Sequence, residues 1–200
     1  MKKLVYLISP NKIQSDFYNH LEKVFSAKNI KFFQLRLKKD NKNKIIKIAK
    51  KIKKITKKHN VKFIINDNPF ISKIVNADGC HLGQNDSSVA FAKKYLRKKI
   101  VGVTCHNSKL LAKIAIRYKA DYLAFGSFNK SKLKPNAQKA NLNILRWAKK
   151  NLKKPIIAIG GINNLNYKKI LKSGAKYIAI SSFIWDNPKL KPEIAIRKFK

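Results

Sequence analysis

The stretch PIIAIGGINNLNYKKILKSGAKYIAISSF, residues 155–183, decides the fold class. It holds two short apolar runs, at 155–161 and 177–183, on either side of a polar and basic segment that we expect to be helical near 164–173. A nearly continuous apolar run is typical of a strand buried on both faces in a parallel sheet. The stretch therefore predicts a strand–helix–strand unit whose two strands are parallel.

The same alternation runs through the rest of the chain. We expect further strands at 3–8, 31–37, 62–66, 80–84, 99–105 and 122–128, and further helices near 15–27, 42–59, 69–76, 88–98, 107–119, 141–152 and 188–199. Eight strands alternating with eight helices predict an α/β fold, a single closed (β/α)₈ TIM barrel that occupies residues 1–200 as one catalytic domain. A doubly wound open sheet is the alternative, but no GxGxxG sequence follows the first strand.

The composition is strongly basic, with 47 Lys and Arg, nine Asp and Glu, and a formal net charge of +38. Lysines are spread along the whole chain and only five residues are Arg, which is more typical of a solvated surface than of an Arg-based nucleic-acid reader. No apolar run is long enough to span a membrane, and Cys80 and Cys105 form no CxxC pair. We expect a cytoplasmic protein without a membrane partner, with nucleic-acid binding as the minor alternative. The sequence is compatible with a homo-oligomer.

Three of the nine carboxylates lie close together in the sequence, at Asp67, Asp78 and Asp86. Asp78 precedes a predicted strand, so we expect a turn residue at the end of the barrel that serves stability. Asp67 and Asp86 follow two adjacent predicted strands, which places them at the opposite end, where barrel enzymes hold their active sites. They are the pair that we expect to bind Mg²⁺, an ion that takes one or two carboxylates together with substrate phosphates.

Cationic side chains are predicted at the same end of the barrel. Gln34, Arg36 and Lys38 alternate along the second strand and share one face, and Lys134 lies in a basic loop after the sixth strand. We expect Arg36, Lys38 and Lys134 to bind the pyrophosphate of a magnesium–pyrophosphate group.

A second phosphate site is predicted at the ends of the last two strands. Gly160 and Gly161 let backbone N–H groups approach an anion, and Ser181 and Ser182 follow the eighth strand. The loops after strands seven and eight commonly bind phosphate in this fold. We expect a helix that starts near Asn164 to add its positive end.

From about Phe33 to Trp185, the chain resembles a known family, the thiamine phosphate synthases. The resemblance rests on seven stretches in a fixed order and on the loop 131–134; the stretches are QLRLK (34–38), IIND (64–67), ADGCHLGQND (77–86), IVGVTCHN (100–107), DYLAFGSF (121–128), IAIGGI (157–162) and ISS (180–182). It implies a Mg²⁺-dependent transferase that joins hydroxymethylpyrimidine diphosphate to thiazole phosphate, or its carboxylate, and gives thiamine monophosphate and pyrophosphate. The implied mechanism is dissociative: pyrophosphate leaves first, and the thiazole nitrogen attacks the resulting pyrimidine-methyl cation.

The resemblance also implies roles for individual residues. The pyrimidine diphosphate would be held by Gln34, Arg36, Lys38, Asn66, Thr104 and Lys134. The thiazole phosphate would be held by Ser131, Lys132, Leu133, Gly161, Ser181 and Ser182. Asp67 and Asp86 match the Mg²⁺ ligands, and the residues expected to act in catalysis are Arg36, Lys38, Thr104 and Lys134. The chain departs from the family at Leu37, where Glu is usual, and at Leu133, where a second hydroxyl is usual.

Two other functions stay open. A thiazole tautomerase, a homologous barrel, would isomerise the thiazole phosphate with His106 as a proton shuttle, but it would not need Asp67, Asp86, Arg36 and Lys134 together. A basic nucleic-acid-associated protein would bind with a steep salt dependence. That function gives no reason for the paired glycines and serines.

Overall fold

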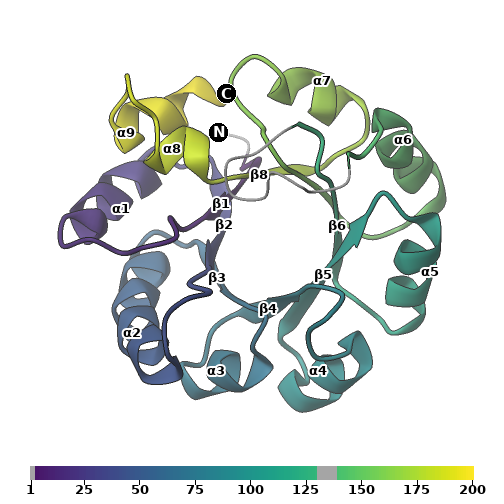
Figure 1. Cartoon of the computed structure of the whole chain (residues 1–200), viewed down its shortest axis with the longest axis horizontal. Helices are drawn as coiled ribbons and strands as arrows, with labels where there is room; N and C mark the ends of the chain where they lie inside the picture. Colours follow the sequence, from purple (N-terminus) through teal and green to yellow (C-terminus); the bar gives the residue numbers. More distant parts are fainter. Residues whose placement is uncertain (1–2, 130–138) are drawn as a thin grey trace.

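The computed structural model describes residues 3–129 and 139–200 as a closed barrel of parallel strands. Each strand pairs with the next one along the chain, and the eighth pairs with the first. The strands are β1 (Val5–Ile8), β2 (Ile30–Leu35), β3 (Lys62–Asn66), β4 (Gly79–Leu82), β5 (Ile100–His106), β6 (Tyr122–Phe125), β7 (Ile156–Ile159) and β8 (Tyr177–Ile180). Figure 1 looks into this ring of strands, with the helices around its outside. The predicted (β/α)₈ barrel is confirmed.

Helices cover the outer face of the barrel. They are α1 (Phe17–Phe25), α2 (Lys42–Lys58), α3 (Pro69–Ile74), α4 (Val89–Leu96), α5 (Lys109–Arg117), α6 (Leu142–Asn151), α7 (Tyr167–Lys172), α8 (Ser182–Trp185) and α9 (Pro192–Ala195), and a 3₁₀ turn, η1 (Ile196–Lys198), ends the series. Within residues 3–129 and 139–200, no helix is long and apolar enough to cross a membrane.

Several helices begin with a neutral cap. A side-chain oxygen accepts a hydrogen bond from a backbone N–H of the first turn at Asn41, Asn68, Ser88, Ser108 and Asn141. Such a bond satisfies one of the donors that a helix leaves unpaired at its start, and a cap is worth about 1 kcal/mol. The amphipathic helices, such as α2 with buried Ile48 and Ile52, then pack their apolar faces on the strands.

The side chains of each strand alternate between two hydrophobic layers. In β1, Val5 and Leu7 face the helices, whereas Tyr6 and Ile8 belong to a second cluster inside the barrel. This inner cluster consists of Tyr6, Ile8, Phe32, Ile64, Tyr122, Ala124, Ile157, Tyr177 and Ala179. Gly102 makes room for it, because a Cβ at that position would lie 1.9 Å from a ring carbon of Tyr122. The barrel interior is therefore a packed core below the site.

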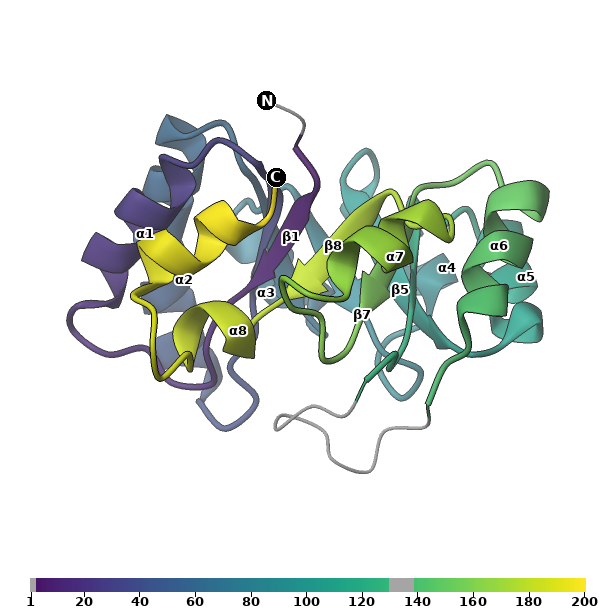
Figure 2. The same ribbon diagram turned by 90° about the horizontal axis from the view of Figure 1, so that it is seen from above.

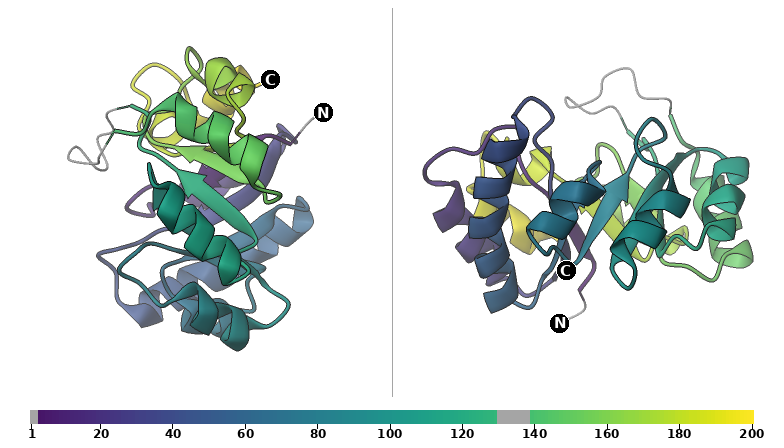
Figure 3. Two further views of the ribbon diagram at one scale, coloured as in Figure 1. Left: turned by 90° about the vertical axis from the view of Figure 1, so that its right-hand side faces the viewer. Right: turned by 90° about the horizontal axis from the view of Figure 1, so that it is seen from below.

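The end of the barrel at which the strands begin is held by two carboxylates. Asp78 accepts a hydrogen bond of 2.9 Å from the backbone N–H of Phe63 and lies 3.0 Å from Lys62 Nζ. Two units later, Asp121 accepts the backbone N–H of Val101 in the same way and pairs with Lys93. Figures 2 and 3 show the barrel from the side, with the C-terminus at this same end. Asp78 thus lies where the sequence predicts, away from Asp67 and Asp86.

Most predicted boundaries differ from the observed ones by a few residues, and three of the differences concern the last two units of the barrel. Residues 182 and 183 were expected in the last strand, but they begin α8 directly after β8. The helix expected near 164–173 starts only at Tyr167, because the side chains of Asn163 and Asn166 accept the backbone N–H groups of residues 163, 165 and 166 and fold them into a turn. The last helix, expected over 188–199, is reduced to α9 and η1, since Pro192 at its first position begins a new helix there.

Candidate active site

A cavity of about 430 Å³ lies at the end of the barrel where the strands stop. It is lined by ten of the residues predicted from the sequence, namely Gln34, Arg36, Lys38, Asn66, Asp67, Asp86, Thr104, Gly161, Ser181 and Ser182. They come from the ends of six different strands. The predicted Ser131, Lys132, Leu133 and Lys134 lie outside the described residues. The structure therefore brings every predicted site residue that it describes to one cavity.

One side of the cavity combines two carboxylates with two cations. Lys38 Nζ lies 3.1 Å from Asp67 Oδ2, and Asp86 Oδ2 accepts a 2.6 Å hydrogen bond from the backbone N–H of Gly83. Burial and the neighbouring Asp86 carboxyl raise the pKa of Asp67, while Lys38 opposes that rise. Burial lowers the pKa of Arg36, and Asp67 works against that shift. Two adjacent carboxylates of this kind suit a shared cation.

The backbone at this point is adapted to present Asp67. Its φ is +62°, a left-handed conformation that Asp tolerates better than most residues, and its N–H donates a 2.7 Å hydrogen bond to the carbonyl of His81 on β4. The same turn leads into the Asn68 cap of α3. Asp67 is thus fixed from both sides while its carboxylate faces the cavity.

The end of β2 and the segment directly after it bring Gln34, Arg36 and Lys38 to the cavity. Gln34 is buried and its Nε2 donates to Asn66 Oδ1, so these two amides form one side of the floor. Leu37 has the opposite orientation: it is buried in the outer hydrophobic cluster and does not line the cavity. At this departure from the family the side chain completes the packing beneath the helices.

The other side of the cavity is built from backbone. Gly160 and Gly161 have φ values of +105° and +58°, a region that residues with a Cβ enter at a cost. A Cβ on Gly160 would also lie 2.0 Å from Ser127 Oγ. Ser181 Oγ donates to the carbonyl of Ser9 at 3.0 Å, so its hydroxyl proton is already used.

The helix that borders the predicted phosphate site is not the one expected from the sequence. The helix predicted near Asn164 begins only at Tyr167, six positions after Gly161, whereas α8 starts at Ser182 on the cavity wall. A short extra helix after the last strand is a frequent part of phosphate sites in this fold. Anionic ligands would therefore meet the backbone N–H groups near Ser182, together with its hydroxyl.

Sequence reasoning missed several residues that line the cavity, of which His81 is the most important. Its ring joins Tyr122 and Thr104, with Nδ1 2.9 Å from the Tyr122 hydroxyl oxygen and Nε2 2.9 Å from Thr104 Oγ1. The signal was present in the strand itself, since His81 alternates with the outward-facing Cys80 and Leu82. A polar residue at an inward position near the end of a barrel strand indicates a site residue.

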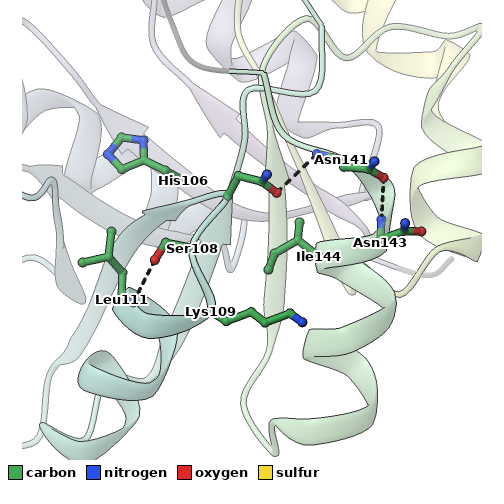
Figure 4. Close-up of a pocket in the computed structure, with 8 residues that line it drawn as sticks. His106, Ser108, Lys109, Leu111, Asn141, Asn143 and Ile144 are labelled. Atoms are coloured by element: carbon green, nitrogen blue, oxygen red, sulfur yellow. Dashed lines mark hydrogen bonds between the residues drawn. The ribbon is translucent and has the colours of Figure 1, made fainter.

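His106 lies at the junction of two hollows. It ends β5, has a φ of +51°, and lines both the main cavity and a neighbouring hollow of about 630 Å³ between the starts of α5 and α6. Figure 4 shows this second hollow, in which Asn107 Oδ1 accepts the backbone N–H of Asn141 and Ser108 Oγ accepts that of Leu111. The N–H groups drawn there are engaged in capping and loop contacts, so the hollow is less suited to an anion than the main cavity.

Neither of the two cysteines is suited to act as a nucleophile. Both are buried, and burial raises the pKa of the Cys105 thiol to about 12 and that of Cys80 as well. A thiol in that state is a weak nucleophile. Within residues 3–129 and 139–200, no group of three or more His, Cys, Asp or Glu side chains is placed to hold a metal.

Comparison with known proteins gives a consistent answer. A family model described as thiamine monophosphate synthase matches residues 5–184. The thiamine-phosphate synthase of Pelagibacter ubique is 58% identical over 201 residues, which cover 100% of this chain and 97% of the relative. That of Picrophilus torridus is 36% identical, with 91% and 88% covered. A solved thiamine phosphate pyrophosphorylase from Pyrococcus furiosus has a TM-score of 0.87 at 26% identity, covering 98% of this chain and 93% of that one. With a barrel, a cavity and relatives that agree, the chain belongs to the thiamine monophosphate synthase family.

Proposed function

We propose that this chain is a thiamine-phosphate synthase, a transferase that joins hydroxymethylpyrimidine diphosphate to thiazole phosphate and releases pyrophosphate. The observation that carries the proposal is the division of one cavity into two anion-binding ends. Arg36 and Lys38 stand beside the two carboxylates at one end, and Gly161 and Ser182 lie at the other. A diphosphate and a monophosphate bound at these ends would place their organic parts side by side between them.

Asp67 and Asp86 would hold Mg²⁺, which neutralises charge on the pyrophosphate when bound. The donor set suits that ion, since both groups are oxygen ligands and the raised pKa of Asp67 reflects a burial and a like-charge contact that a cation relieves. Arg36 and Lys38 would bind the remaining phosphate oxygens and stabilise the negative charge that develops as pyrophosphate leaves. Lys134 belongs to the same proposed set of cations.

The other residues would orient the reactants. Gln34 and Asn66, already paired with each other, would hold the pyrimidine end, and Thr104 would contact the diphosphate. Gly161, Ser182 and the loop residues Ser131, Lys132 and Leu133 would bind the thiazole phosphate. Ser181 would join them by exchanging its hydrogen bond to the Ser9 carbonyl for one to the phosphate. Positioning of the two reactants by these side chains and charge neutralisation by the cations suit a dissociative reaction. The substrates would be small molecules of the cytoplasm.

The test is incubation of the purified protein with both substrates and Mg²⁺, with thiamine monophosphate and pyrophosphate measured as products. We expect both in equal amounts, and neither when Mg²⁺ is removed by a chelator. A dissociative step further predicts slow, Mg²⁺-dependent hydrolysis of the pyrimidine diphosphate when thiazole phosphate is left out. Isomerised thiazole phosphate without any condensation, lost in His106→Ala, would establish the tautomerase function instead.

A further inference from the structure

A chain of hydrogen-bonded side chains runs through the barrel core to the floor of the cavity. The hydroxyl oxygens of Tyr6 and Tyr122 are 2.8 Å apart, Tyr122 meets His81 Nδ1 at 2.9 Å, and His81 Nε2 meets Thr104 Oγ1 at 2.9 Å. Both tyrosines are 2% exposed and His81 is 7% exposed. Thr104 is half-buried and lines the cavity. The interior of a barrel is usually apolar, so this polar chain needs an explanation.

The direction of these hydrogen bonds follows from the Tyr6 end of the hydrogen-bonded series. Each tyrosine has one hydroxyl proton, and a neutral imidazole has one N–H donor and one bare acceptor nitrogen. Among the described residues, the Tyr6 hydroxyl is hydrogen-bonded only to Tyr122. If Tyr122 donated to Tyr6, the Tyr6 proton would lack an acceptor in a dry core, which disfavours that arrangement by roughly tenfold or more. Tyr6 therefore donates to Tyr122.

The remaining donors are then fixed in sequence. Tyr122, which accepts from Tyr6, donates its own proton to His81 Nδ1. His81 must carry its proton on Nε2 and donate it to Thr104 Oγ1. The hydroxyl proton of Thr104 therefore points away from His81. Burial raises the pKa of both tyrosines, which keeps these donors protonated.

We infer that Tyr6, Tyr122 and His81 are positioning residues that make Thr104 a hydrogen-bond donor to a phosphate oxygen in the cavity. The inference rests on the proposed function only for the identity of that phosphate, the pyrimidine diphosphate. An anionic oxygen can only accept, so a hydroxyl held as a donor binds it without first breaking another bond. Gly102 is part of the same device, because any side chain there would displace the Tyr122 ring.

The direction can be tested in the free protein, without substrate. Ring ¹⁵N chemical shifts distinguish a protonated from a bare imidazole nitrogen, the chain has only four His, and His81→Asn assigns the signals. We expect the His81 proton on Nε2 in the wild-type protein. A proton on Nδ1 would reverse the chain and overturn the inference.

The positioning role is tested by a double-mutant cycle with Tyr122→Phe and Thr104→Val. The readouts are the Kd of inorganic pyrophosphate with Mg²⁺ and, separately, kcat/KM for the pyrimidine diphosphate. We expect Tyr122→Phe to weaken each by about three- to tenfold, the effect of one hydrogen bond, and to cause no further loss in the Thr104→Val background. Tyr177→Phe is the matched control, because Tyr177 lies in the same inner cluster but is not part of the series of hydrogen-bonded side chains. Both readouts should stay within twofold.

Equal losses for Tyr122→Phe in both backgrounds, or an equal loss in Tyr177→Phe, would mean that Tyr122 acts only through packing. Failure of the proposed function looks different. In that case the wild-type protein forms no thiamine monophosphate, while the position of the His81 proton and the pyrophosphate cycle still decide the inference.

Discussion

Replacing Asp67 and Asp78 by Asn should give opposite phenotypes, although both are aspartates next to neighbouring strands. Asp67 lies on the cavity wall, 3.1 Å from Lys38 Nζ, and Asp78 lies at the other end of the barrel, bonded to Lys62 and to the N–H of Phe63. Both substitutions conserve shape and remove one negative charge. The pair therefore separates a role in the reaction from a role in the fold.

The expected effects on stability can be worked out from these contacts. A carboxyl whose pKa is raised by folding destabilises the native state when it is ionised at neutral pH. Asp67→Asn removes the cost of holding this carboxylate ionised in the folded state. It also loses one half-exposed ion pair worth about 0.2–1 kcal/mol, so the free energy of unfolding should stay within about 1 kcal/mol of the wild type. Asp78→Asn loses an ion pair and a charge-assisted hydrogen bond to backbone, so it should cost about 1–2 kcal/mol, or roughly 2–8 °C in Tm.

The expected effects on activity are reversed. Asp67→Asn should lower kcat by roughly 10²–10⁴, since a lost metal contact is worth several kcal/mol at 1.4 kcal/mol per tenfold. High Mg²⁺ should restore part of that rate, because the diphosphate supplies ligands of its own. Asp78→Asn should keep kcat within about twofold. The assay measures pyrophosphate release against Mg²⁺ concentration, with thermal unfolding of the same preparations.

The reasoning fails if Asp78→Asn is the inactive variant, or if Asp67→Asn keeps the wild-type rate and Mg²⁺ dependence. Asp86→Asn serves as an internal check, because its carboxylate lies on the same cavity wall. It should behave like Asp67→Asn in activity. A variant that is both unfolded and inactive would be uninformative at Asp67, so unfolding is measured first, and the expected Tm is close to that of the wild type.

Three further predictions concern other parts of the molecule. Gly161→Val, at a φ of +58°, should strain the backbone by about 1–2 kcal/mol and weaken thiazole phosphate binding about tenfold by calorimetry while sparing pyrimidine diphosphate; an equal loss of both would refute two separate ends. Glu22 has a pKa lowered by His59 and then by Lys58, so Glu22→Gln should reduce the free energy of unfolding at pH 7 by under about 1 kcal/mol. A lowered carboxyl pKa stabilises the fold in full only above the ordinary value, near 4.5, so the difference should shrink below that pH and vanish as the pH falls through the lowered pKa. Duplex DNA and RNA should bind only weakly at physiological salt, with a steep log–log salt slope; sub-micromolar binding in a shift assay would contradict the interpretation of the lysines as a solvated surface.

The barrel was predictable because its signal is local and is repeated eight times. The strand at 62–66 was predicted with its observed bounds, and α2 to within one residue, since a long Ile-rich helix has a clear period. The start of α8 was not predictable in this way. Four residues make one turn, which is too short to show a helical period, and Phe183 continues the apolar pattern of β8 as well as it begins a helix.

A site residue was predictable where the alternation of side chains along a strand, or the end of a strand, fixes where the side chain lies. Gln34, Arg36 and Lys38 alternate, and Asp67 and Asp86 follow adjacent strands, so the fold alone brings them together. His81 could not be assigned a partner, because Tyr6 and Tyr122 lie 75 residues before it and 41 residues after it, and only the closure of the barrel makes them neighbours. Long-range hydrogen bonds of this kind leave no pattern in the local sequence.

The neutral helix caps have a consequence for how the protein responds to acid. In many proteins Asp fills some of these positions, and protonation then weakens the start of the helix. Here the five capping side chains are Asn or Ser, which keep their hydrogen bonds at any pH. The strands are tied together differently at the base of the barrel, where Asp78 and Asp121 accept backbone N–H groups of neighbouring strands. Acidification adds positive charge to a chain that already carries +38. The added self-repulsion should loosen the tertiary packing while the neutrally capped helices persist, so the near-ultraviolet circular dichroism should be lost at a higher pH than the far-ultraviolet signal.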